Sequence, residues 1–185
     1  MKVKRYDEII ADSSFYICFL DDVNRPEILH RIIKEFNFII TPLVKNEIEK
    51  SENYARIQSN KNIFFPEFSF DYGEILKAFF SEEEIIKGEH GVIGTAYILY
   101  RLNRNFCFIL DDQDPRKFVV SNIPDLVKFM TGTVNFIGLC CCSYKLLKKD
   151  ETLILLNQIE KSKFRIKKSI LSQVKLYVGG CKNGL

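Results

Sequence analysis

Residues 106–116 read F-C-F-I-L-D-D-Q-D-P-R, and this stretch decides how the chain of 185 residues is expected to fold. Its first five residues are all apolar, which is typical of a strand covered on both faces, as in a parallel sheet. Asp111 and Asp112 follow at the carboxyl end, and Pro115 then opens a helix. The stretch therefore predicts a buried parallel strand that ends in carboxylates.

Other apolar runs predict further strands, with helices between them. Expected strands cover residues 14–20, 38–40, 62–65 and 126–130, and the first of these has an alternative start at Tyr6. A helix is expected over residues 72–80, and three more over 134–147, 151–161 and 168–177. This alternation predicts the α/β class: one three-layer domain, residues 1–185, with a parallel sheet of about five strands. The sheet part is expected over residues 1–131 and a helical tail over 132–178.

Composition narrows the functional classes. A hydrophobic share of 46% supports a sizeable core, and the net charge of +3 permits contact with nucleic acid without arguing for it. The six cysteines lack the spacing of a zinc site, and we expect no disulfide framework. The charged N-terminus is unlike a signal peptide, and no apolar run reaches the ~20 residues of a membrane span. We therefore expect a cytoplasmic protein without membrane contact.

At four places in the sequence, acidic residues stand near residues that begin or end a predicted strand or helix. The places are Asp12 in A-D-S-S, Glu47 in T-P-L-V-K-N-E-I, Glu89 in K-G-E-H-G, and the Asp111-Asp112 pair. Each alone has an ordinary explanation as a cap, a turn residue or an exposed helix charge. Two carboxylates ~4 Å apart, however, repel by about 4 kcal/mol at an effective dielectric of 20. Convergence of several would require a cation, and oxygen ligands suit Mg²⁺ or Mn²⁺.

The ordered set of motifs resembles the PIN-domain superfamily of metal-dependent ribonucleases, which includes the VapC-type toxins. The motifs, in chain order, are A-D-S-S, T-P-L-V-K-N-E-I, K-G-E-H-G-V-I-G-T-A-Y-I-L, F-I-L-D-D-Q-D-P-R, T-G-T-V-N-F-I-G-L and K-F-R-I. The resemblance runs from Tyr6 to about Tyr177. The chain departs from the family pattern at Pro115, where a small residue is usual before Arg116, and at Lys163, where glycine is usual.

Membership would imply hydrolysis of RNA phosphodiesters with one or two Mg²⁺ or Mn²⁺ ions. The implied catalytic residues are Asp12, Glu47, Glu89, Asp111 and Asp112. All of these except Glu47 are implied metal ligands, and the choice among Asp111, Asp112 and Asp114 stays open. Ser13, Ser14 and Arg116 are implied to contact substrate, with a structural salt bridge as the alternative for Arg116. A toxin would have a small antitoxin partner over the acidic pocket, and the long tail would suit a homodimer.

Two other readings stay open. The chain is alternatively a catalytically silent PIN-like module that binds RNA or a protein. Another Mg²⁺-dependent phosphotransfer fold would need a D-x-D motif or a strand-end Lys, and neither is clear. A serine hydrolase is disfavoured because no G-x-S-x-G motif occurs.

Overall fold

A five-stranded parallel sheet forms the centre of the protein, which confirms the predicted α/β class. The computed structural model describes residues 5–65 and 87–181. All strand pairs in it are parallel, and the strand order is β3-β2-β1-β4-β5. The strands are β1 (Glu8–Ala11), β2 (Asn37–Ile39), β3 (Ile63–Phe64), β4 (Phe106–Ile109) and β5 (Met130–Thr131). The chain builds outward from β1 to β3 and then returns to the other side of β1, so the strand order switches between β1 and β4.

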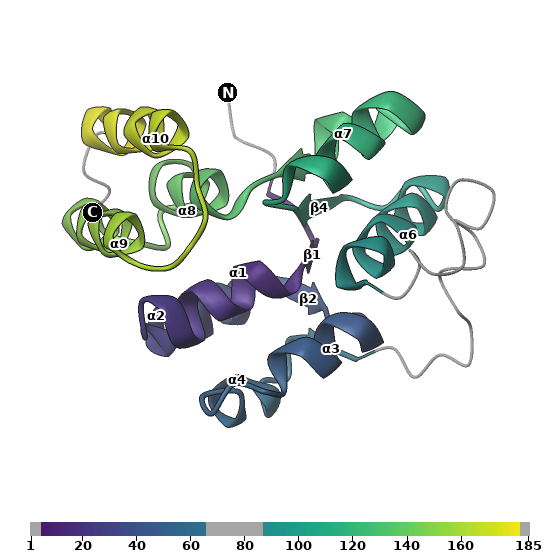
Figure 1. Cartoon of the computed structure of the whole chain (residues 1–185), viewed down its shortest axis with the longest axis horizontal. Helices are drawn as coiled ribbons and strands as arrows, with labels where there is room; N and C mark the ends of the chain where they lie inside the picture. Colours follow the sequence, from purple (N-terminus) through teal and green to yellow (C-terminus); the bar gives the residue numbers. More distant parts are fainter. Residues whose placement is uncertain (1–4, 66–86, 182–185) are drawn as a thin grey trace.

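Helices cover both faces of this sheet (Figure 1). Helices α6 and α7 lie on one side, and α1 and α2 lie on the other. The helices are α1 (Ser13–Ile17), α2 (Pro26–Glu35), α3 (Pro42–Ile48), α4 (Ala55–Gln58), α6 (Gly88–Arg101), α7 (Gln113–Asn122), α8 (Thr133–Cys142), α9 (Lys149–Lys161) and α10 (Lys168–Gly180). A π-helix, η1 (Cys18–Asp22), and a 3-10 helix, η3 (Pro124–Phe129), complete the described elements.

Two predicted strands are corrected. Residues 14–20 form α1 and part of η1, and the first strand lies before Asp12, within the alternative that starts at Tyr6. The run misled because α1 is buried on most sides, and periodicity alone cannot separate a short buried helix from a buried strand. Residues 126–130 lie almost entirely in η3, and β5 is only two residues long. The helix expected over residues 72–80 lies outside the described residues.

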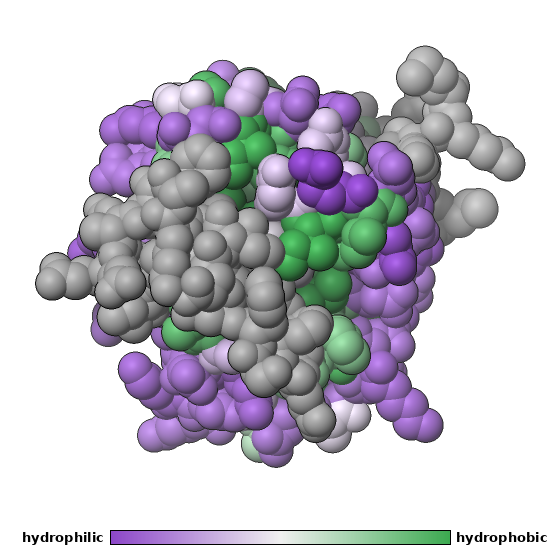
Figure 2. All heavy atoms as spheres, turned by 90° about the vertical axis from the view of Figure 1, so that its right-hand side faces the viewer, coloured by the Kyte–Doolittle hydropathy of each residue, from purple (hydrophilic) through white to green (hydrophobic). Residues whose placement is uncertain are grey.

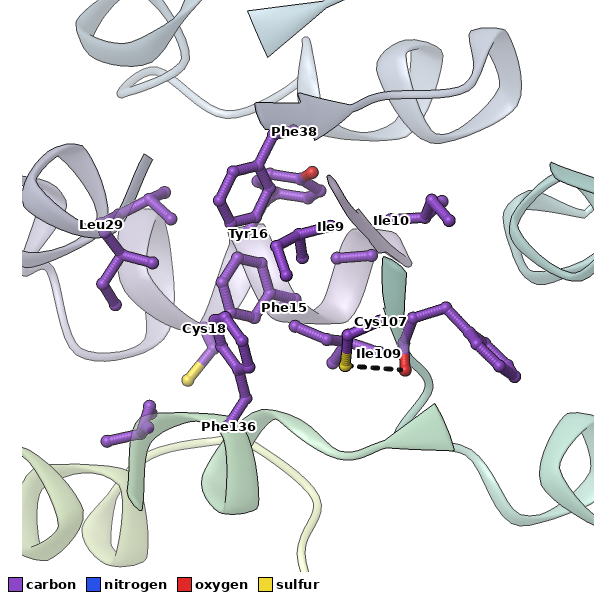
Figure 3. Close-up of a cluster of buried hydrophobic side chains, with 14 of the residues drawn as sticks. Ile9, Ile10, Phe15, Tyr16, Cys18, Leu29, Phe38, Cys107, Ile109 and Phe136 are labelled. Carbon is purple, nitrogen blue, oxygen red and sulfur yellow. Dashed lines mark hydrogen bonds between the residues drawn. The ribbon is translucent and has the colours of Figure 1, made fainter. Parts of the chain in front are cut away.

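An aromatic cluster joins α1 to the sheet and to α8. The Phe15 ring stacks on Phe38 of β2 at 5.8 Å between centroids and meets Phe136 of α8 edge-on at 6.0 Å. Ile9 of β1 lies on this side, whereas Ile10 points to the opposite face (Figure 3). Burying each of these large side chains contributes roughly 1.5–3 kcal/mol. The cluster therefore fixes the start of α1 against the carboxyl end of β1.

The tail folds as the packed helices α8, α9 and α10, at the positions that the sequence predicts. A disulfide joins Cys142, at the end of α8, to Cys181, just after α10. This bond contradicts the expectation that the cysteines remain unpaired, because the two helix ends meet across 39 residues of sequence. Within the described part of the chain, the other four cysteines are free and buried.

The face that carries α6 and α7 mixes hydrophilic and apolar residues, with apolar residues gathered near its centre (Figure 2). Among residues 5–65 and 87–181, no helix is both long and apolar enough to cross a bilayer.

Candidate functional site

Asp12 begins the candidate site at the carboxyl end of β1. It directly follows Ala11, which pairs with Ile109 of β4. Its Oδ1 accepts a hydrogen bond from the Phe15 backbone N–H at 3.3 Å, so the carboxylate caps α1. The Ser14 hydroxyl donates to the same oxygen at 2.7 Å. Only 6% of Asp12 is exposed, and its carboxylate is therefore held rigidly in a nearly dry position.

Asp111 faces Asp12 from the end of the neighbouring strand. Its backbone N–H donates to Asp12 Oδ2 at 3.4 Å, and the Ser14 hydroxyl also lies 3.4 Å from Asp111 Oδ2. Thr133, the first residue of α8, donates its N–H to Asp111 Oδ1 at 2.9 Å and its hydroxyl to Oδ2 at 2.5 Å. We call Asp12 and Asp111 the acid pair. Strand register brings the pair together at the switch in strand order, where open α/β sheets bind their ligands.

The charge of the acid pair is only partly balanced within the described protein, where the nearby Arg116 guanidinium acts against the burial that raises the pKa of Asp111. The pKa of Asp12 is raised to about 7, because burial and the charge of Asp111 together outweigh the opposing hydrogen bonds. Burial also raises the pKa of Asp111, opposed mainly by the two hydrogen bonds from Thr133. Within residues 5–65 and 87–181, neither carboxylate forms an ion pair. A buried and a half-buried carboxylate linked through one hydroxyl favour a bound cation or a shared proton.

Glu47 and Glu89 lie at a second place, the junction of α3 and α6. Glu47 Oε1 accepts a hydrogen bond from the Gly88 backbone N–H, the first residue of α6, at 3.3 Å. Glu89 is half-buried in the first turn of α6. Because α6 leads directly into β4 and packs against β1 and β4, its first turn lies at the edge where the strands end. We call Glu47, Gly88 and Glu89 the α3–α6 junction.

The structure does not gather all four predicted acidic places into one tight cluster. Among the residues described, no group of three or more His, Cys, Asp or Glu is placed to hold a metal ion. Asp12 and Asp111 come together, Glu47 caps α6, and Asp112 is exposed at the start of α7. Asp114 is exposed and pairs with Lys117 at 3.0 Å. Asp111 is thus the member of its run that faces Asp12.

The predicted substrate residues have distinct surroundings. Ser14 bridges the acid pair, and Ser13 is half-buried beside it at the start of α1. Arg116 Nη1 donates to the carbonyl oxygens of Leu110 at 2.7 Å and Thr131 at 3.1 Å, which ties the ends of β4 and β5 together. This contact gives Arg116 a structural role at the edge of the site, and substrate contact by it stays a prediction.

The acid pair fits a small divalent cation bound through few protein ligands. Mg²⁺ usually keeps several waters and is held by one or two carboxylates together with substrate phosphates. Asp12 and Asp111 supply two such carboxylates, already oriented and without an ion pair in the described chain, although the charge of the nearby Arg116 acts on Asp111. A cage built only from protein side chains does not fit this arrangement among the residues described.

Sequence reasoning missed the residues that support Asp111. Thr133 is fully buried and donates twice to the carboxylate, yet only the helix-start pattern T-G-T hinted at its role. Gly132 also packs closely against Asp111, since a Cβ at this position would lie 3.0 Å from Asp111 Oδ1. A pocket of about 630 Å³ opens beside Asp111 and is lined in part by residues 164–167, which carried no predicted role.

Comparison of the chain with protein-family models, with curated proteins and with solved structures gave no match.

Proposed function

We propose that this protein is a PIN-type, metal-dependent endoribonuclease that hydrolyses RNA phosphodiester bonds. The observation that carries the proposal is the acid pair: a buried and a half-buried carboxylate linked through Ser14 at the switch in strand order, with no ion pair in the described chain. The ordered motifs and the parallel α/β fold support it further. The proposal extends to a cytoplasmic location and to a homodimer formed through the tail. As a toxin, the protein would be held inactive by a small antitoxin protein.

In this proposal Asp12 and Asp111 hold Mg²⁺ or Mn²⁺, with Glu89 and Asp112 as further ligands from the edge of the site. The bound ion lowers the pKa of water and stabilises negative charge on the phosphate. Attack of water on phosphorus breaks the bond to the 3′ oxygen, which leaves as a 3′ hydroxyl and leaves a 5′ phosphate on the other product.

The chain's own residues orient the reacting groups. Ser14 sets the distance between the two carboxylates, and Thr133 fixes the plane of Asp111. Arg116 joins the ends of β4 and β5 and thereby holds the strand ends that carry Asp111 and Thr133. Glu47 anchors the first residue of α6 and so positions Glu89. Rigid support of this kind lowers the cost of assembling the site for reaction.

The test is cleavage of single-stranded RNA in Mn²⁺ by the wild type and by Asp12→Asn. We expect cleavage that EDTA abolishes, and no cleavage by Asp12→Asn at a comparable melting temperature. Asp150→Asn, an equal charge change at an exposed position in α9, is the matched control and should cleave like the wild type. Cleavage by Asp12→Asn at the wild-type rate would exclude the proposed site.

A second candidate is a PIN-like module that binds RNA without cutting it. It is favoured by the absence, among the residues described, of a group of three acidic or histidine ligands. Calorimetric titration with Mn²⁺ separates the two candidates. The nuclease should bind Mn²⁺ through Asp12, whereas the silent module should give the same weak titration with and without the Asp12 carboxylate.

A further inference from the structure

The pocket beside Asp111 is built by three segments that are distant in sequence. Its walls come from the first turn of α7, the first turn of α8 and residues 164–167 before α10. Its volume of about 630 Å³ falls in the range of roughly 300–1,000 Å³ that small-ligand sites occupy. Asp111 and Asp112 are among the lining residues, so the pocket reaches one member of the acid pair.

The tail wall of the pocket carries positive charge. Arg165 and Lys167 are both exposed, and neither has an acidic partner in the described parts of the chain. Arg116 adds a third cation, although its guanidinium is engaged by two carbonyl oxygens. Unpaired cations that face a pocket suit a phosphate or carboxylate ligand.

The same wall carries apolar side chains in alternation with the cations. Phe164 and Ile166 are half-buried and pack on the core, whereas Arg165 and Lys167 are exposed. The Phe164 N–H donates to Ser162 Oγ at 3.1 Å, and the Ser162 hydroxyl donates to the Ile159 carbonyl at 2.9 Å, which anchors the segment to the end of α9. The wall is thus an anchored surface on which the Phe164 ring lies next to Arg165, and Ile166 lies between Arg165 and Lys167.

We propose that this pocket binds one nucleotide of the RNA strand next to the phosphate that is cleaved. Arg165 and Lys167 bind the flanking phosphate, the base packs on Phe164, and the exposed Asn135 at the start of α8 offers hydrogen bonds to the base edge. The inference rests on the proposed function, since it places the adjoining phosphate at the acid pair.

The arrangement of charge favours a nucleic-acid strand over an acidic peptide. A peptide carboxylate that reached the cations would also be repelled by Asp111 and Asp112, which line the same pocket. An RNA strand brings its next phosphate to those acids together with the proposed divalent ion, which removes the repulsion. Stacking on aromatic rings is tolerant of base identity, so we expect weak sequence preference from Phe164.

The test compares two pocket variants with a matched control. Arg165→Ala/Lys167→Ala removes both exposed cations, and Phe164→Leu removes the ring but keeps an apolar side chain. Lys50→Ala/Lys61→Ala removes the same charge from exposed positions near α3 and β3. Melting temperatures establish that each variant is folded, and the exposed double variant keeps the test valid if Phe164→Leu is unstable.

Binding of a short fluorescent single-stranded RNA is measured by anisotropy in the Asp12→Asn background, where no cleavage is expected. We expect Arg165→Ala/Lys167→Ala to lower the salt slope of log Kd by about 0.7, because both cations contact the one flanking phosphate and each neutralised phosphate of a single strand contributes about 0.7. Phe164→Leu should raise Kd about fivefold or more without changing that slope. The control variant Lys50→Ala/Lys61→Ala should change the salt slope less than Arg165→Ala/Lys167→Ala does, and Kd less than either pocket variant does.

Cleavage by otherwise wild-type variants gives an independent measurement. The pocket variants should raise KM at least about fivefold and change kcat less than twofold. If the wild type cleaves RNA and the pocket pair matches the control pair in KM and Kd, the pocket inference is wrong and the nuclease proposal stands. If no RNA is cleaved but the pocket variants change Kd and its salt slope as expected, the nuclease proposal is wrong and the nucleotide pocket stands. Displacement of RNA by a polyglutamate peptide at equal concentration would also overturn the pocket inference.

Discussion

The acid pair and the α3–α6 junction hold carboxylates in different ways. Asp12 and Asp111 follow paired strands directly, and each accepts at least two hydrogen bonds from fixed donors. Glu47 projects from a helix and accepts one backbone hydrogen bond through a longer, more flexible side chain. The difference teaches that strand register preorganises a carboxylate more strictly than a helix surface does. We therefore expect the acid pair to be less tolerant of change.

The largest expected effect is on catalysis. Asp111→Asn should lower kcat/KM for RNA cleavage in Mn²⁺ at least about a hundredfold, because metal-ion catalysis contributes several kcal/mol. Glu47→Gln should cost clearly less, since a glutamine oxygen can still accept from the Gly88 N–H. Equal losses of kcat/KM in Asp111→Asn and Glu47→Gln would contradict the expected difference between the acid pair and the α3–α6 junction.

The next largest effect is the dependence of stability on pH without metal. Burial raises the pKa of Asp12 from its ordinary value of 3.8 to about 7, so the folded state holds this proton more tightly than the unfolded chain. The stabilising contribution is full below about pH 4 and is lost as pH rises through 7, by roughly 4 kcal/mol in total. Asp111 acts in the same direction.

This effect is measured by thermal unfolding between pH 5 and pH 8. The wild type should lose stability over this range relative to Asp12→Asn, which carries no titrating group at this position. Mn²⁺ should raise the melting temperature of the wild type at pH 8 and leave that of Asp12→Asn nearly unchanged. If the melting temperatures of the two proteins changed with pH in the same way, the pKa of Asp12 would not be raised in the folded state.

Thr133→Val sharpens the comparison by removing one donor from Asp111. Loss of a hydrogen bond to a buried charged group should lower the free energy of unfolding by about 1–3 kcal/mol, and more at pH 8 than at pH 5. Thr152→Val is a matched control, because the Thr152 hydroxyl donates to a neutral carbonyl, that of Lys148, at 2.8 Å. The control should cost about 0.5–1.5 kcal/mol without pH dependence. Urea unfolding at both pH values provides the measurement.

The smallest effects come from one glycine in each region. A Cβ at Gly132 would lie 3.0 Å from Asp111 Oδ1, and a Cβ at Gly88 would lie 3.1 Å from Glu47 Oε2. Asp111 cannot move without losing Thr133, so Gly132→Ala should destabilise by about 1–3 kcal/mol. The Glu47 side chain can swing away, but the Cβ would also lie 3.2 Å from Cγ2 of the buried Val44, so Gly88→Ala should cost about 1 kcal/mol, less than Gly132→Ala. Gly180→Ala, with no atom within 4 Å of its Cβ, is the control in the same unfolding experiment.

The sequence predicted the fold where a pattern was long or doubly buried. Residues 106–110 were expected as a covered strand because no polar residue interrupts them, and β4 forms there. The run after Asp12 was misread, because α1 and η1 bury aromatic side chains on several sides and leave no clear period. The tail helices were found with errors of only a few residues at their ends.

The candidate site was predicted in part. Asp111 was expected at the end of a strand, whereas Asp12 was expected before the strand over residues 14–20 or within a longer strand from Tyr6; the pairing of β1 with β4 brings the two aspartates together. The hydrogen-bond partners of the carboxylates could not be predicted from the sequence. Thr133 contacts Asp111 only because the chain between them forms a strand and then turns into α8. The disulfide between Cys142 and Cys181 depended likewise on the packing of helices far apart in sequence.

Thr133 gives the tail a part in the chemistry of the sheet. It is both the first residue of α8 and the residue that donates two hydrogen bonds to Asp111. A fragment cut at residue 131, the end of the sheet, would keep every strand but would leave Asp111 without these donors. The smallest portion of the chain able to hold both aspartates in register must therefore include α8, and the border between scaffold and appendage runs after this helix.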